Sequence, residues 1–430
     1  MKQILLIGFI FSVLISNAQD TLLLSIEKLN SLTLEQNLTI KSNAADFNLS
    51  KSEYQIQIGK VLPTISFGVR QYSLEGFTQS TEGDFVDVNK NNEFRGRSVT
   101  AKWDLSNLLF NSLSEKKKIN AASYKNESDN IDEKIKISDL FYDLAASQNS
   151  EKVLEQILNK NTEIVNQMNL QYSAGLILES DLLLSKANLN NLHIKLLGQK
   201  KQTYTLNQKL ISILNIEGDY FIKTESDFYN TDFNQNIYSD ISQNATKRME
   251  FMSSDLLFQS QELQFKKQKV GFLLPNISVG LNDGMFGGIG LDPVGNQNLL
   301  TASLMWDIPF SRLFQSGEVK KQQQILQIYS FEKESLKNEL ISEMRTLVSD
   351  LKLSNEQLEF AAQSVDFTKK AYSHSLQRQQ LGTANQLELF HAEKEYINAQ
   401  LIYIESLSVM HKLKLKEVLI LQEKILDEKK

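Results

Sequence analysis

The sequence predicts a mainly α-helical protein with a small β part, in which one structural unit occurs twice. Three observations support this fold class. Landmarks recur in the same order in both halves, two very long segments contain neither glycine nor proline, and two pairs of segments alternate apolar and polar residues. Each copy is therefore expected to hold a β-hairpin followed by a very long α-helical hairpin.

The duplication rests on three landmarks. GKVLPTISFG at 59–68 reappears as GFLLPNISVG at 271–280, which places Pro63 and Pro275 212 residues apart. The dipeptide Trp-Asp and a glycine followed by an acid-Leu pair recur further on, with shifts of 203 and 207 residues. Because the shifts nearly agree, we infer a duplication with insertions in the loops between the landmarks.

Two long helices are expected where glycine and proline are absent. Residues 97–174 and 318–381 contain neither, and in a helix interior glycine costs about 1 kcal/mol and proline about 3 kcal/mol. Apolar residues recur there at i, i+3, i+4 and i+7, the spacing of one helix face. As a helix, residues 112–174 would extend roughly 95 Å.

Glycines end both segments. Gly175 and Gly382 lie where one helical pattern stops and another begins, and glycine readily adopts the left-handed conformation that closes a helix. Each glycine therefore marks the tip of a helical hairpin. The returning helices are expected over 180–215 and 385–423.

Alternation of apolar and polar residues predicts four strands. It occupies residues 65–70, 99–105, 277–281 and 300–308. This pattern is typical of transmembrane strands and also of a soluble β-sandwich. The Gly-, Asp- and Asn-rich segments 71–97 and 282–298 are expected to be hairpin loops.

Four residues near the helix-proximal ends of these strands are candidates for a membrane interface. Trp103 and Trp306 lie where an interfacial aromatic girdle would place them, and Pro63 and Pro275 precede the first strand of each copy. The alternative is that both tryptophans are core residues.

The first eighteen residues have the layout of a secretory signal peptide. Lys2 precedes an apolar run from Ile4 to Ile15, and Ser16-Asn17-Ala18 offers a small-residue cleavage site, whereas a buried helix would not need this order. The run is too short to span a bilayer as a helix. We expect export, with Gln19 as the first mature residue. The chain has no cysteine, so neither acylation of a cysteine nor a disulfide is expected.

Beyond the signal, no apolar run approaches the ~20 residues of a transmembrane helix. Entry into a membrane would then require a β-barrel, which satisfies every backbone polar group in lipid. Four strands cannot close a barrel, so several chains would have to share one.

The predicted domain organisation follows from the duplication. Repeat 1 covers 19–217, a connector covers 218–237, and repeat 2 covers 238–430. Each repeat begins with a helix. The β-hairpins are expected at about 60–107 and 272–310, and the helical hairpins at about 112–217 and 318–427, with tips at 175 and 382.

The paired Leu-Pro-x-Ile-Ser-x-Gly strands, the paired Trp-Asp strand ends and the paired tips resemble the TolC family of outer-membrane efflux channels. The resemblance implies a homotrimer with a twelve-stranded β-barrel in the outer membrane of a Gram-negative bacterium, continued by a periplasmic α-helical barrel. It also implies an exit duct for efflux or type I secretion that opens at its helical tip. The implied partners are a periplasmic adaptor and an inner-membrane pump of the RND or ABC type.

The resemblance also points to a constriction at the tip. Glu388 falls on the first acidic position of the family's gate, His391 stands where a family member carries a second carboxylate, and Asp181 is the matching acid of the first copy. Three Glu388 side chains would attract cations, and three His391 would add positive charge as the pH falls towards about 6.5. We expect lower cation selectivity and greater pH sensitivity than two acidic rings would give. The alternative is that these are ordinary solvated side chains.

The sequence gives little support for an enzymatic function. Without cysteine there is no thiol chemistry, and no two of the four histidines have metal-ligand spacing. Glu388-x-x-His391 matches one half of a di-iron motif, but the duplicated position lacks the histidine. The sequence contains no nucleotide-binding loop, and a net charge of −6 argues against nucleic-acid binding. We expect neither catalysis nor a cofactor. The alternative function is a periplasmic structural or adaptor-like coiled-coil protein.

Overall fold

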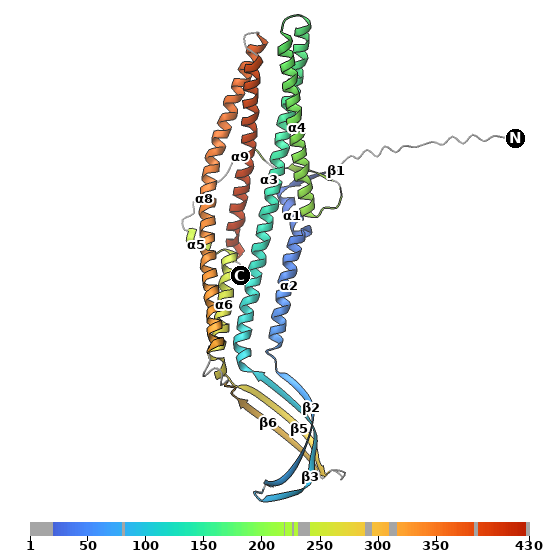
Figure 1. The fold of residues 1–430 in the computed structure, drawn as a ribbon, viewed down its shortest axis with the longest axis vertical. Coiled ribbons are helices and arrows are strands. Elements are labelled where there is room, and N and C mark those ends of the chain that lie inside the picture. Colours follow the sequence, from blue (N-terminus) through green and yellow to red (C-terminus); the bar gives the residue numbers. More distant parts are fainter. Residues whose placement is uncertain are drawn as a thin grey trace, which may run out of the picture. The chain divides into compact units, whose positions relative to one another are not determined.

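The computed structural model describes residues 20–79, 82–218, 220–225, 228–230, 241–288, 295–308, 316–381 and 386–426 (Figure 1). The expected signal peptide and the second tip glycine, Gly382, lie outside these residues. Within them, no helix combines the length and the apolar character needed to cross a bilayer.

The chain forms two compact units, each containing segments of both predicted repeats. The tip unit comprises Met1–Lys41, Ile131–Asn236 and Leu347–Leu421, and the sheet unit comprises Ser42–Asn130, Ile237–Thr346 and Gln422–Lys430. The repeat boundaries remain predictions, because compact units and repeats divide the chain in different ways.

Long helices and two sheets account for most of the described chain. The helices are α1 (Ile26–Gln36), α2 (Leu38–Gly59), α3 (Ser112–Ser173), α4 (Glu179–Leu214), α5 (Ile241–Ala245), α6 (Met249–Val270), α8 (Gly317–Gln380) and α9 (Gln386–Leu426). The strands are β1 (Asp20–Ser25), β2 (Thr64–Gln79), β3 (Phe85–Asp104), β4 (Tyr220–Glu225), β5 (Asn276–Gly288) and β6 (Gly295–Met305). A π-helix (Asn107–Asn111) precedes α3, and a 3₁₀ turn (Gly271–Leu273) follows α6.

The four-stranded antiparallel sheet of the sheet unit has the order β2-β3-β5-β6. The two predicted hairpins meet where β3 pairs with β5, with Trp103 opposite Ile277. The expectation that 71–97 and 282–298 are loops was wrong. β2 continues to Gln79 and β3 begins at Phe85, because a partner strand satisfies the backbone of polar residues as well as that of apolar ones and so overrides their low strand propensity.

In the rows nearest the helices, the register gives this sheet one apolar face and one polar face. Residues directly opposite one another point to the same side. The rows on the apolar face are Ile65–Ala101–Val279–Ala302 and Phe67–Val99–Leu281–Leu300. The intervening row is Ser66–Thr100–Gly280–Thr301. The apolar face is uncovered in the chain, since Phe67 is 80% exposed and Leu300 is 73% exposed.

The helices of the sheet unit pack closely through small and apolar side chains. The hydroxyls of Ser114 on α3 and Ser260 on α6 are buried and lie 2.8 Å apart, so the two helix backbones approach closely. Ala245, Leu340 and Met344 form a small buried cluster there.

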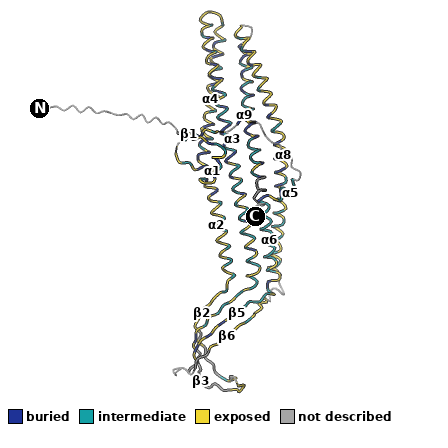
Figure 2. Tube along the Cα trace, turned by 180° about the vertical axis from the view of Figure 1, so that it is seen from behind, coloured by how far each residue is buried: buried dark blue, intermediate teal, exposed yellow. Residues whose placement is uncertain are grey.

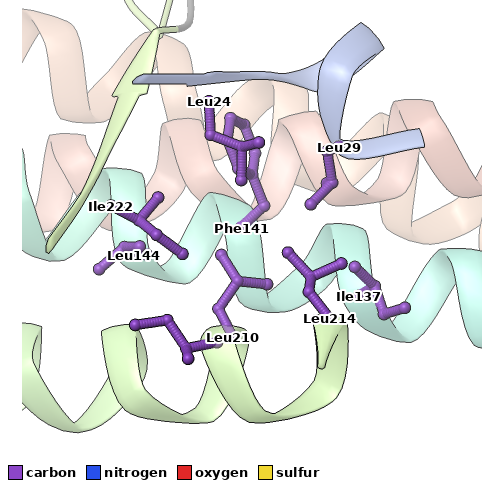
Figure 3. Packing of buried hydrophobic residues seen from close by; sticks show 9 residues of the cluster. Leu24, Leu29, Ile137, Phe141, Leu144, Leu210, Leu214 and Ile222 are labelled. Atoms are coloured by element: carbon purple, nitrogen blue, oxygen red, sulfur yellow. The ribbon is translucent and has the colours of Figure 1, made fainter. Parts of the chain in front are cut away.

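Eight of the twelve largest fully buried side chains gather where α3 and α4 meet a two-stranded parallel sheet, β1-β4 (Figure 3). Leu24 and Ile222 come from the strands, Phe141 and Leu144 from α3, and Leu210 from α4. This sheet was not predicted from the sequence. β4 lies inside the predicted connector, and its partner lies at the start of the chain.

Two side-chain amides, one buried and one half-buried, hydrogen-bond to the backbone of β4. Asn207 accepts a hydrogen bond from the Ile222 N–H (2.7 Å) and donates one to the Tyr220 carbonyl (3.0 Å). Gln148 donates to the Ile222 carbonyl (2.6 Å) and accepts from the Thr224 N–H (3.2 Å). A two-stranded sheet leaves backbone groups unpaired at its edges, so these side chains replace a third strand.

Candidate functional site

The first helical tip is closed by Gly175. Its φ of 73° is left-handed, its N–H donates to the Tyr172 carbonyl (2.9 Å), and the Leu176 N–H donates to the Gln171 carbonyl (2.9 Å). This pair of bonds caps the last carbonyls of α3 in the way expected of a glycine that ends a helix. The chain then turns into α4 at Glu179.

At the second tip, an ion pair joins the end of α8 to the start of α9. Arg378 lies in the last turn of α8 and Glu388 in the first turn of α9, with Nη1 and Oε1 2.7 Å apart. Their side chains are 54% and 42% exposed, so the pair contributes at most about 1 kcal/mol to stability. The pair matters more for the local charge than for stability, because the Arg378 guanidinium offsets the negative charge of Glu388, the candidate gate residue.

The other two candidate tip residues lie on different parts of the tip unit. Asp181 is half-buried in the first turn of α4, and its carbonyl accepts a hydrogen bond from Ser185 (2.9 Å). His391 is exposed on α9 and lines a hollow of about 570 Å³ between α4 and α9. Ile194, Lys195 and Phe390 also line this hollow.

A buried acid, Glu393, joins the two helical hairpins. It projects from α9 and is only 3% exposed. Asn161 on α3 donates to its Oε1, and Asn188 on α4 donates to its Oε2 at 2.9 Å. Asn161 also donates to the Ile157 carbonyl (3.1 Å), which fixes its amide.

Apolar packing surrounds this polar contact. Leu154, Ile157 and Leu158 of α3, Leu192 and Leu196 of α4, and Ile397 of α9 form one buried cluster. Burial raises the pKa of the Glu393 carboxyl, and the two amides and Lys195 oppose that rise. Burial also raises the pKa of nearby Tyr372, and the Glu393 charge adds to this effect. The pair of hairpins is thus joined by a carboxyl group that is costly to keep charged.

A second polar contact fastens the connector to α9. The ring of His411 stacks on Tyr142 with centroids 5.0 Å apart, and its Nε2 lies 3.0 Å from the carbonyl of Phe228. Burial lowers the pKa of His411, although the Phe228 carbonyl works in the opposite direction. The neutral imidazole with a proton on Nε2 fits this contact.

The four candidate interface residues all lie at the helix-proximal end of the sheet. Pro63 and Pro275 immediately precede β2 and β5. Trp103 lies at the end of β3, and Trp306 follows β6. Trp306 is 54% exposed, and its indole N–H donates to the Leu273 carbonyl (3.1 Å).

Solved structures are similar to the chain over most of its length. VceC, an outer membrane protein of Vibrio cholerae, is 13% identical, and the match covers 92% of this chain and 95% of that one with a TM-score of 0.69. The CmeC outer membrane channel of Campylobacter jejuni is 14% identical, over 93% of this chain and 85% of that one, with a TM-score of 0.65. The open MtrE outer membrane channel of Neisseria gonorrhoeae is 13% identical, over 92% and 88%, with a TM-score of 0.64.

The chain has the fold of these channel proteins. No protein-family model matches its sequence, and no curated protein is similar to it in sequence.

Within this channel fold, the residues that bridge the two helical hairpins were not predicted from the sequence. Glu393 continues an apolar stripe of α9 between Leu389 and Ile397, and Asn161 interrupts the apolar stripe of α3. A charged or amide residue inside such a stripe was the available signal. Arg378 gave no comparable signal, because it lies in a polar stretch of the sequence. Among the described residues, no group of three His, Asp or Glu could hold a metal ion.

Proposed function

We propose that the chain is an outer-membrane channel that passively conducts substrates from an inner-membrane pump and a periplasmic adaptor to the outside. One observation carries the proposal. A four-stranded sheet with an uncovered apolar face is joined to long helical hairpins, and solved channel proteins share the fold over about nine-tenths of the chain. A soluble coiled-coil protein would have no reason to leave Phe67 and Leu300 in water.

The proposed assembly is a homotrimer. β2 and β6 form the two edges of the sheet, and an edge strand presents unpaired backbone groups that lipid cannot satisfy. Three chains with four strands each would close a twelve-stranded barrel whose apolar faces contact outer-membrane lipid. The helices would then continue the duct through the periplasm, and residues 1–18 would direct export.

The candidate residues take their roles from this assembly. Trp103, Trp306, Pro63 and Pro275 would mark the periplasmic membrane interface. Gly175 and Gly382 would form the tips that meet the adaptor, which in turn joins a pump of the RND or ABC type. Asp181, Glu388 and His391 would line the constriction, which opens when the helical hairpins separate.

Planar-bilayer recording of the purified chain tests the proposal. We expect discrete conductance steps, together with recovery of the protein in the outer-membrane fraction and trimers that dissociate only on heating. A protein found in the soluble periplasmic fraction and without conductance would instead support the adaptor-like coiled-coil function.

A further inference from the structure

A recess of about 430 Å³ opens in the tip unit between α3, α4 and α9. Its lining includes Ser147 and Ser150 from α3, Gln202 and Leu206 from α4, and Glu405 from α9. Buried and exposed positions alternate along all three helices (Figure 2). Because small-molecule sites usually measure ~300–1,000 Å³, the recess can hold a small organic molecule.

Three polar side chains in this recess are available to a ligand. Ser150, Gln202 and Glu405 form no hydrogen bond or ion pair with any described residue. Ser150 is only 8% exposed, and a buried hydroxyl without a partner costs free energy. A ligand in the recess that bonds to Ser150 would therefore recover that free energy.

The other polar side chains of the recess are paired with the protein, which fixes its shape. Gln199 of α4 donates to the Ser147 hydroxyl (2.7 Å). Ser408 of α9 donates to the Tyr142 carbonyl of α3 (3.2 Å). These bonds join α3 to both neighbouring helices, so the recess exists before a ligand enters it.

The charge of the recess comes from Glu405. Lys412 and Asp143 form an ion pair, so the two carboxylates and one ammonium of the lining leave a net charge of −1. Apolar side chains, including Leu206 and Leu401, lie beside these groups. A carboxylate next to apolar surface favours an organic cation, which can form a charge-assisted contact and also remove apolar area from water.

The recess lies on the side of α3 away from the β1-β4 sheet. Leu144 and Gln148 of α3 contact that sheet, whereas Asp143 and Ser150 lie about 140° and 160° from Gln148 round the helix. In a ring of helices the small sheet must lie outside, since inside it would obstruct the duct. The recess would then open to the lumen.

We propose that this recess binds a small organic cation with an apolar body as the cation passes through the channel. Glu405 contacts the cationic group, Gln202 and Ser150 hydrogen-bond to polar groups, and Leu206 and Leu401 contact the apolar body. The site itself depends only on its lining, whereas its place on the conduction path rests on the proposed function.

Ethidium, a fluorescent organic monocation, tests the site. Its anisotropy is followed during titration with the full chain in a nonionic detergent, with empty micelles as the baseline. We expect saturable binding that Glu405→Gln weakens about tenfold, because one charge-assisted contact is lost. Glu405 is exposed, so the variant should fold normally, as circular dichroism checks. Equal binding by the two proteins, or no saturable binding, would overturn the site.

The matched control is Glu395→Gln, which removes another exposed carboxylate of α9 outside the recess. It should leave ethidium binding unchanged. Anilinonaphthalene sulfonate, an organic anion of similar size, should bind no more weakly to Glu405→Gln than to wild type. If Glu395→Gln weakened ethidium binding as much as Glu405→Gln does, general surface charge would explain the effect and the site would be overturned.

A substitution on α3 separates binding in the recess from attraction by charge alone. Ser150→Leu reduces the open space without changing the charge, so it should weaken ethidium binding, whereas Ser150→Ala keeps the space and should weaken it less. Equal ethidium binding by wild type and a folded Ser150→Leu variant would place the dye elsewhere and overturn the site.

Conductance separates the site from the proposed function. In planar bilayers, ethidium should reduce the current through wild type, and the concentration needed should rise about tenfold in Glu405→Gln. Specific ethidium binding by a chain that forms no channel would leave the site standing and contradict the proposed function. A conducting channel whose current ethidium does not change would overturn the place of the site on the conduction path.

Discussion

At the scale of single residues, the buried carboxyl of Glu393 makes stability depend on pH. Burial raises its pKa in the folded chain, so the folded state binds more protons than the unfolded state as the pH falls towards that raised value. The free energy of unfolding must then increase as the pH falls through this window. The carboxyl group therefore destabilises the folded chain least in mildly acidic solution, where it is protonated.

Glu393→Gln tests this sign. The variant should lack the part of the stability gain between pH 7 and pH 5 that the carboxyl supplies, as measured by chemical unfolding of the detergent-solubilised chain. Half-buried His411 has a lowered pKa and acts in the opposite direction. The relevant quantity is therefore the difference between wild type and variant, in which the contribution of His411 cancels. Parallel pH profiles for the two proteins would contradict the assignment.

A second prediction at this scale concerns Arg378. Because its guanidinium lies 2.7 Å from Glu388, Arg378→Gln should increase the preference of the proposed channel for cations, as read from the reversal potential in a salt gradient. Stability should change by less than about 1 kcal/mol, since the pair is exposed. Lys370→Gln, which removes a somewhat more exposed ion pair with Asp366, should leave the reversal potential unchanged.

At the scale of secondary-structure elements, β4 depends on side chains rather than on a third strand. Asn207→Ala would leave the Ile222 N–H and the Tyr220 carbonyl without their partner inside a buried cluster, at a cost of roughly 1–3 kcal/mol. Hydrogen exchange should show faster exchange at Ile222 in particular. Thr205→Ala, on the exposed side of the same helix, is the control and should leave that exchange rate unchanged.

Helices and strands could be predicted from the sequence where a single local property of the chain determines them. The absence of glycine and proline predicted α8 and the end of α3 almost to the residue, because every residue of a long helix is subject to the same steric cost. The lengths of β2 and β3 were not predictable in this way, since their polar ends are strands only because partners pair with them. The β1-β4 pair was missed for a related reason, since it joins residues 200 positions apart, Asp20 with Tyr220.

The residues of the candidate site also differ in whether local sequence predicts them. Gly175 was predicted from its place between two helical patterns, and its left-handed backbone agrees with that place. Glu393, Asn161 and Asn188 act together only because three helices converge, and no spacing within one helix specifies that convergence. The roles of Glu388, His391 and Asp181 in a constriction remain predictions.

At the scale of the whole molecule, the uncovered face of the sheet carries the proposed location in a membrane. Phe67→Lys places a charge in the apolar row, where lipid contact would make it costly by about 2–4 kcal/mol at mid-membrane depth. We expect less trimer in the outer-membrane fraction. Ser66→Lys, one residue away on the polar face, is the matched control and should assemble normally. Equal recovery of the two variants would argue against lipid contact at this face.

The order β2-β3-β5-β6 also fixes the kinetics of assembly. Among the described strands, β2 and β6 each have one partner, so a lone chain can form all of its helices but cannot finish its sheet. In the proposed trimer, the last step in forming the native state would then be second order or higher in protein, and its half-time should shorten as the chain is made more concentrated. Helix formation, measured on the same sample, should keep a rate that does not depend on concentration.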